Sequence, residues 1–333
     1  MQITRTVARD GSILPRALDV IRRVPDEAWT YGEQGLLHPR VAYTRAFSKV
    51  AVAWQSVMPA LAVLSAELRF DGLEPDVGSV ETKYGNLLHA LYEHIDACYA
   101  VMRCVGPAPA KPVQWHQVAV RAQKVPGARA FEDQVIAYKN LSLGPTVNLL
   151  KHGESRLRVL AFRSRFAFTL GYFIDGPQRG GVIGPAPTVH HDENSAFSFN
   201  RDILVHWWWL YRVSELLADV VERNLGSKML PVSDGNGSGV VPLEAVDEWV
   251  KLCHAIAAIP PDFMPDESEK PYPLVVVPPT GASIRLEYPA PRRPNKFDRE
   301  AKITACLTID EGGQTYKLPY VGDAQNVVTV EGR

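Results

Sequence analysis

The chain has 333 residues, of which 46% are hydrophobic, and its formal net charge at neutral pH is -1. This length accommodates one large hydrophobic core or two domains, and the composition excludes a disordered chain. Proteins that bind polyanions over their whole surface carry a basic excess, so the near-neutral charge excludes a general polyanion binder and leaves a local basic groove as the alternative.

The sequence carries no sign of export or membrane insertion, and its cysteines do not indicate a metal site. The N-terminus has no apolar segment typical of a signal peptide, and no run of about 18 apolar residues predicts a membrane span. The cysteines form no CxxC pair and no zinc-type spacing, which favours reduced, buried thiols; they are Cys98, Cys104, Cys253 and Cys306. We therefore expect a cytoplasmic protein without a cofactor or a metal.

Two helical regions are predicted in the first seventy residues. A short helix is expected over Arg16–Arg23, ending before Pro25. The segment Val41–Arg69 is rich in apolar residues but contains Pro59, and proline breaks or kinks a helix. This segment therefore predicts either two helical pieces or one bent helix.

The next helix has the clearest periodicity in the chain. Its apolar residues recur at intervals of four and three, as on one face of a helix in a bundle; they are Tyr84, Leu88, Leu91, Ile95, Cys98 and Met102. Residues 105–128 are expected to form a loop with little regular structure. A third helix is predicted over Ala130–Leu141, and a short continuation ends at Gly153, a glycine suited to a helix C-terminus.

The periodicity then changes to two. Between Val159 and Ile174 apolar residues alternate with polar ones, which predicts half-buried strands of a small antiparallel sheet. Arg163 and Arg165 share the polar parity and are expected on the outer face of this sheet. The β insertion is predicted to span about residues 159–198.

The remaining segments complete the predicted domain organisation. A helix is expected from Arg201 to Leu225 with its end at Gly226, followed by the linker SDGNGSG (233–239). Another helix is expected over Leu243–Ala258, and strands follow from Leu274, with a hairpin turn at DEGG (310–313). The predicted fold is mainly α: an N-terminal segment (1–40), a helical bundle with the β insertion (41–232), and a β-rich C-terminal region (233–333).

The stretch FNRDILVHWWWLY (199–211) contains the best candidates for chemistry. Ser198 or Asn200 can cap the start of a helix, and a carboxylate at Asp202 suits the positive end of the helix dipole. Asp202 and His206 are four residues apart and share one helix face, so the carboxylate can orient the imidazole. Arg201 is five residues from His206, about 140° around the axis, and does not share that face.

An arginine followed by a polar residue and, five positions after the arginine, a histidine resembles the signature of HEPN-domain ribonucleases, here Arg201, Asp202 and His206. The resemblance implies a helical bundle that forms a homodimer, with the Arg and His of two domains meeting to cleave RNA without metal. It also implies a toxin or antiviral-defence role. The chemistry is reasonable, since a His can move the proton of a ribose hydroxyl and an Arg can stabilise phosphoryl charge.

Other residues are assigned supporting roles in this hypothesis. A basic stretch is the expected RNA contact, formed by Lys151, Arg156, Arg158, Arg163 and Arg165. His191 and Glu193, in the loop that leads into the motif, are expected to line the same pocket. Trp207 and Trp209 are candidates for a homodimer interface, with core packing and stacking on RNA bases as the alternatives.

Three alternatives stay open. Arg201 and His206 can be structural residues at the start of a buried helix. The chain can then be a non-catalytic interaction or scaffold protein that binds a protein partner through its C-terminal region. A metal-dependent hydrolase that uses the run from His190 to Glu193 is the third, because His and carboxylate side chains are metal-ligand types.

Overall fold

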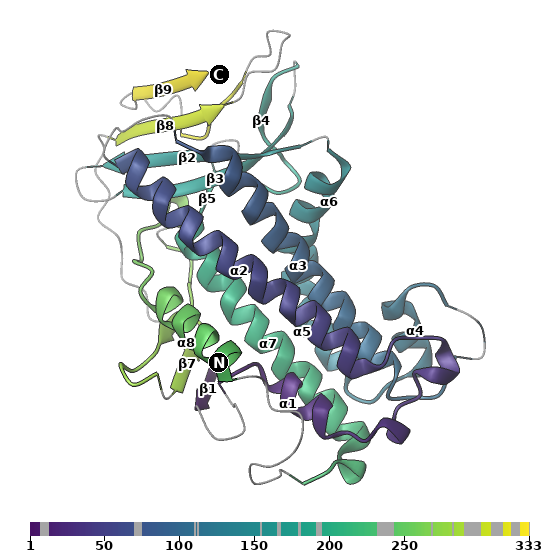
Figure 1. The fold of residues 1–333 in the computed structure, drawn as a ribbon. Helices are drawn as coiled ribbons and strands as arrows, with labels where there is room; N and C mark the ends of the chain where they lie inside the picture. The colour runs from purple at the N-terminus through teal and green to yellow at the C-terminus, as the bar shows by residue number, and fades with distance from the viewer. Residues whose placement is uncertain are drawn as a thin grey trace.

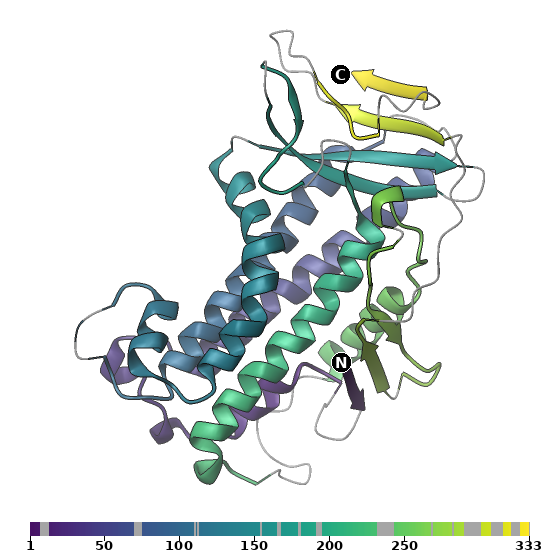
Figure 2. The same cartoon turned by 180° about the vertical axis from the view of Figure 1, so that it is seen from behind.

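The fold is mainly α with β elements, as predicted. It is seen in a computed structural model that describes residues 1–6, 13–69, 75–109, 111, 113–153, 155–164, 168–178, 181–190, 195–231, 243–267, 269–281, 283–289, 301–307, 316–320 and 327–332. Long helices run side by side, and a sheet lies across one end of them (Figure 1). A second, smaller sheet and one further helix lie along the side of the bundle, as the view from behind also shows (Figure 2).

Eight α-helices are present in the described residues. They are α1 (Arg16–Arg23), α2 (Pro39–Arg69), α3 (Val77–Arg103), α4 (His116–Gln123), α5 (Ala128–Tyr138), α6 (Gly144–His152), α7 (Phe199–Leu225) and α8 (Leu243–Ala257). A π-helical turn, Lys139–Leu143, joins α5 to α6. Short 3-10 turns lie at Asp26–Ala28, Gly32–Gln34, Gly226–Lys228 and Pro265–Glu267.

Helix α2 runs without a break through Pro59, so of the two predicted alternatives the one with separate helical pieces is wrong. Pro59 is exposed, and its missing backbone donor therefore lies on the solvent side of the helix. Buried residues on both sides of it, Trp54 and Leu61 among them, hold the two halves on one core. By length and composition alone α2 could cross a membrane, although 33% of its most apolar window is buried in the bundle.

Helix α4 lies within residues 105–128, where a loop was predicted, and that prediction is wrong. Only two of its side chains, Ala119 and Val120, are buried, so the apolar signal in the sequence is too short to reveal a helix. Tertiary contacts with α3 and α5 supply the stability that an isolated eight-residue helix lacks.

Two glycines, Gly153 and Gly226, were expected to end helices, and the structure shows a different conformation at each. Gly153 follows α6 with a φ of 71°, the left-handed conformation predicted for it. Gly226 has a φ of -57° and leads into a 3-10 turn, so the chain does not reverse there in the predicted way. At the other end of α7, the Ser198 hydroxyl accepts a hydrogen bond from the Arg201 amide at 3.3 Å, and Ser198 is the N-cap.

The predicted β insertion is present, and the C-terminal region completes its sheet. Strands β2 (Leu157–Ser164) and β3 (Phe168–Pro177) pair antiparallel, and β8 (Ala301–Leu307) pairs with the other edge of β2. The short strands β4 (Ile183–Pro185) and β5 (Phe197–Ser198) pair with β3, and β9 (Val327–Gly332) pairs parallel with β8. Residues predicted as a separate tail therefore belong to the same sheet as the insertion.

The second sheet joins the N-terminal segment to the C-terminal region in the same manner. Strand β1 (Gln2–Thr6) pairs with β7 (Ser283–Glu287), which pairs with β6 (Leu274–Val276). The three predicted parts of the chain thus share their sheets. The predicted linker (233–239) and hairpin turn (310–313) lie outside the described residues.

Both faces of the β2–β3 sheet are covered, so the expected polar outer face is absent from these described strands. Val159 and Tyr172 face the main helical core, whereas Leu160 and Phe173 face a second cluster that includes Met264 and residues of β8. The alternation in the sequence indicated a strand correctly, but the segments that cover its outer face come from far along the chain.

Candidate functional site

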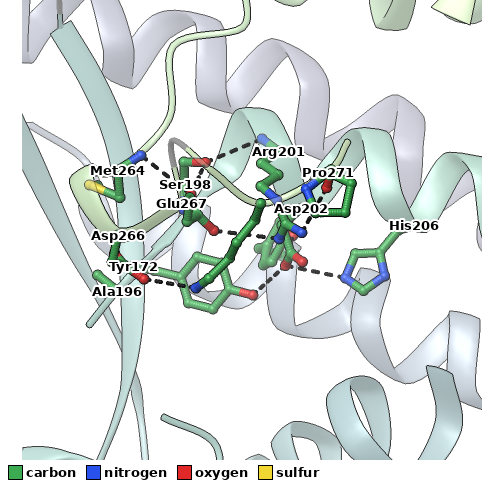
Figure 3. Close-up of polar contacts among 12 residues, drawn as sticks. Tyr172, Ala196, Ser198, Arg201, Asp202, His206, Met264, Asp266, Glu267 and Pro271 are labelled. Atoms are coloured by element: carbon green, nitrogen blue, oxygen red, sulfur yellow. Dashed lines mark hydrogen bonds and ion pairs between the residues drawn. The ribbon is translucent and has the colours of Figure 1, made fainter. Parts of the chain in front are cut away.

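Three side chains converge on Asp202, at the start of α7, and Figure 3 shows two of them, Tyr172 and His206. Its Oδ2 atom accepts hydrogen bonds from the hydroxyls of Tyr84, at 2.7 Å, and Tyr172, at 2.5 Å. The same oxygen lies 3.2 Å from Nε2 of His206, one helical turn further along α7. The hydroxyl of Tyr138 lies 2.8 Å from Nδ1 of His206. We call these five residues the Asp202 cluster.

The Asp202 cluster joins four elements of the fold. Tyr84 comes from α3, Tyr138 from α5, Tyr172 from β3, and the remaining two residues from α7. All five side chains are buried. The cluster therefore ties the sheet to the bundle at the point where α7 begins.

The carboxylate of Asp202 is held in its charged form. Burial alone raises the pKa of a carboxyl, but the charge of His206 and the hydrogen bonds from His206, Tyr172 and Tyr84 outweigh it and lower the pKa of Asp202 to about 2. Burial, together with the Asp202 charge, raises the pKa of both tyrosines well above its usual range, so they stay hydroxyl donors.

His206 is closed off from solvent. It is 2% exposed, and its two ring nitrogens face Asp202 and Tyr138. Tyr138 is covered in turn by Trp209, whose ring stacks on it at 4.9 Å with an interplanar angle of 7°. Both ring nitrogens therefore face groups of the protein itself. A general acid or base, in contrast, must reach its substrate directly or through one water.

Arg201 points to a different part of the structure. Its guanidinium donates to the backbone oxygen of Pro271 at 3.0 Å and lies 3.7 Å from the carboxylate of Glu267. Glu267 is fully buried and also accepts from the backbone amides of Ser198 and Met264. Arg201 thus fastens Glu267 and Pro271 to the start of α7.

Glu267 is a fully buried carboxyl with a raised pKa. Burial raises its pKa to about 7, while the neighbouring Arg201 and hydrogen bonds from Ser198 act in the opposite direction. The structure therefore places the two residues of the Arg–His motif in separate settings, Arg201 with Glu267 and His206 with Asp202. It brings the Asp202–His206 pair together as the spacing predicted.

Two of the basic residues predicted to contact RNA, Arg158 and Arg163, are engaged by partners within the chain. Arg158 is buried and donates to Asp175 at 2.7 Å, and the backbone amide of Arg156 also donates to Asp175. Arg163 donates to the backbone oxygen of Leu68, at 2.5 Å, and to that of Arg69, at 3.0 Å.

These partners correct the expectation for two of the predicted arginines. Arg158 serves a buried ion pair, and Arg163 stabilises the C-terminal carbonyls of α2. Lys151 is exposed at the end of α6, and Arg165 lies outside the described residues.

The acidic and histidine-rich loop before α7 is described only in part. His191 and Glu193 lie outside the described residues. The Nε2 atom of His190 accepts a hydrogen bond from the Ile174 amide at 3.0 Å, and its ring stacks on Phe197. Within the part of the chain that the structure describes, no three His, Cys, Asp or Glu side chains are grouped to hold a metal ion.

The tryptophans of α7 pack inside this chain. Trp207 is fully buried and stacks on Trp249 at 4.9 Å, with Trp54 edge-on at 5.6 Å. Trp207 therefore packs in the core and cannot reach a second chain, whereas Trp209 is half-buried and packs on Tyr138. Cys98, Cys104 and Cys253 are free, buried thiols, as expected.

The residues that sequence reasoning missed are the partners of Asp202 and Arg201. Tyr84 and Tyr172 were recognised only as members of apolar patterns, yet a buried tyrosine needs a partner for its hydroxyl. That requirement is the signal that could have connected them to the nearest buried carboxylate. Nothing in the local sequence of Glu267 indicates that it is buried.

Comparison with known proteins adds no family to this description. No family model matches the chain, and neither does any curated protein or solved structure.

Proposed function

We propose that this chain is a non-catalytic interaction protein, in which the Arg201–His206 motif stabilises the fold. The observation that carries the proposal is the enclosure of His206, which is buried with each ring nitrogen facing a side chain of the same core. The engagement of Arg201 by Glu267 and Pro271 supports it, because neither group is directed to a common reaction centre. The hydroxyls of Tyr84, Tyr138 and Tyr172 all have partners in this buried network, and networks that join several elements in this way specify a unique core packing.

A metal-independent endoribonuclease on a HEPN-like homodimer, with a toxin or antiviral-defence role, is the second candidate. The Asp202–His206 pair favours it, because an aspartate that orients an imidazole is a common arrangement in general acid–base catalysis. It requires a rearrangement that exposes His206 and separates Arg201 from Glu267. Its RNA contacts would be residues other than Arg158 and Arg163, which have partners within the chain.

Incubation of the purified chain with RNA in EDTA separates the two candidates. We expect no cleavage above that of a variant with Arg201→Gln and His206→Gln. Cleavage by the natural sequence that this variant loses would establish the ribonuclease, provided that urea unfolding shows the variant to be folded. Arg212→Gln, on the same helix but bonded to Gln134 at the surface, is a matched control that retains any true activity.

A further inference from the structure

The end of the bundle opposite the large sheet has an unusual charge pattern. Residues 97–131 contain no aspartate or glutamate but five basic residues, although acidic and basic residues are equally frequent in the whole chain. Helix α4 lies in this segment, at the end of the bundle far from β2, β3 and β8 (Figures 1 and 2). The near-neutral net charge therefore hides a local basic region.

Trp115 stands at the start of α4 and is the most exposed large hydrophobic side chain in the described residues, at 69%. Val118, one turn further, is 47% exposed on the same side of the helix. Five of the other six tryptophans are buried, and Trp209 is half-buried. An exposed indole has no role in the core of this chain, and large exposed aromatics are typical of binding surfaces.

The helix that carries Trp115 is firmly attached to the bundle. Gln117 and Arg121 both donate to Glu132 of α5, and Gln123 donates to the backbone oxygens of Arg103 and Pro107. These contacts fix the inner side of α4 and leave its outer side to solvent. The surface around Trp115 is therefore a preformed platform.

The basic residues of this region are partly neutralised. Arg121 pairs with Glu132, and Arg129 lies 3.8 Å from Asp133. Lys111 and Lys124 are exposed, and neither has an ion-pair partner among the residues that the structure describes. These two lysines flank α4 in the sequence and supply the positive charge available to a partner.

We propose that this surface, formed by Trp115, Val118, Lys111 and Lys124, binds single-stranded nucleic acid, with a base stacked on Trp115 and phosphates near the lysines. An exposed indole in a segment with five basic and no acidic residues fits an unstacked base and its phosphates, because Glu132 and Asp133, which follow the segment, are already paired with Arg121 and Arg129. A membrane surface requires a longer apolar face than one eight-residue helix with two exposed apolar side chains. The proposal rests on the proposed function, in that the chain acts by binding.

Fluorescence anisotropy with a labelled 20-nucleotide single-stranded RNA in EDTA tests the proposal. We expect Trp115→Ala to weaken binding about 5- to 150-fold, the effect of losing one stacked base, and Trp115→Phe to restore part of it. Lys124→Gln is expected to lower the dependence of log Kd on log salt by about 0.7, the value for one phosphate contact with a single strand. Lys302→Gln, exposed on β8 at the other end of the molecule, is the matched control and should change neither.

Equal affinity of the natural sequence and Trp115→Ala would overturn the proposal, as would an equal loss in Lys302→Gln. Binding to anionic lipid vesicles that Trp115→Ala abolishes, without binding to RNA, would also overturn it and assign the surface to a membrane. Absence of RNA binding would overturn this proposal and leave the proposed function standing with a different partner. Cleavage of the RNA that His206→Gln abolishes would overturn the proposed function and leave the Trp115 surface in place.

Discussion

Replacing Tyr84 with phenylalanine removes one hydroxyl from the Asp202 cluster and leaves the aromatic ring in the core. The lost hydrogen bond is 2.7 Å long and reaches a buried, charged carboxylate. Hydrogen bonds to charged groups contribute about 1.5–3 kcal/mol, so we expect the free energy of unfolding to fall by this amount. Tyr172→Phe removes the other hydroxyl donor and should cost about the same.

The double variant is the sharper test. After the first substitution Asp202 still accepts one hydroxyl hydrogen bond, but after the second its charge keeps only His206 as a side-chain partner in the cluster. We therefore expect the double variant to lose more than the sum of the single losses, by about 0.5–3 kcal/mol.

Urea unfolding monitored by circular dichroism measures these differences, with an unchanged slope as the sign that only stability has altered. Tyr31→Phe is the matched control, because the Tyr31 hydroxyl has no hydrogen-bond partner among the described residues. Its free energy of unfolding should change by less than about 0.5 kcal/mol. If Tyr84→Phe and Tyr172→Phe behaved like this control, the structural role of the Asp202 cluster would be refuted.

Three further predictions concern pH and helix continuity. The folded-state pKa of Asp202, about 2, lies below its ordinary value of 3.8, so its contribution to stability of about 2 kcal/mol is complete above about pH 5. It should be lost progressively as the pH falls through 3.8 toward 2, and the free energy of unfolding measured against pH, compared with that of Asp202→Asn, tests this. The pKa of Glu267 is raised from 4.5 to about 7, so the natural sequence should lose stability as the pH rises through this interval, by about 3 kcal/mol. Glu267→Gln should remove this slope, and an unchanged slope would show that another group causes it. Pro59→Ala should raise the free energy of unfolding by about 1–3 kcal/mol, because it restores a backbone donor within α2; a loss of stability would mean that α2 needs the proline.

The helices and the insertion could be predicted because their signals are local. The stripe from Tyr84 to Met102 repeats at helical spacing over most of α3, and the alternation from Val159 to Ile174 covers β2 and β3. Helix α4 has only two buried side chains, and β1 and β9 depend on partners from distant parts of the chain. Elements whose stability comes from such long-range contacts leave little pattern in the sequence.

The candidate site was predicted in the same partial way. Helix geometry placed Asp202 and His206 together and Arg201 off their face, and the structure has this arrangement. The burial of His206 depends on Tyr138 and Trp209, and the engagement of Arg201 depends on Glu267, which is 66 residues away in the sequence. Whether a helix face points to a core or to a cleft is decided by such partners, and a short motif carries no information about them.

Solvent access to His206 tests the central claim most directly. Hydrogen–deuterium exchange at the imidazole C2 position, followed by mass spectrometry, reports the access of water to each histidine ring separately. His152 is exposed at the end of α6 and supplies the reference within the same chain. We predict that His206 exchanges far more slowly than His152 in the folded protein and at a similar rate after unfolding in urea. Equal rates in the folded protein would contradict the assignment of His206 to the core and favour a catalytic role.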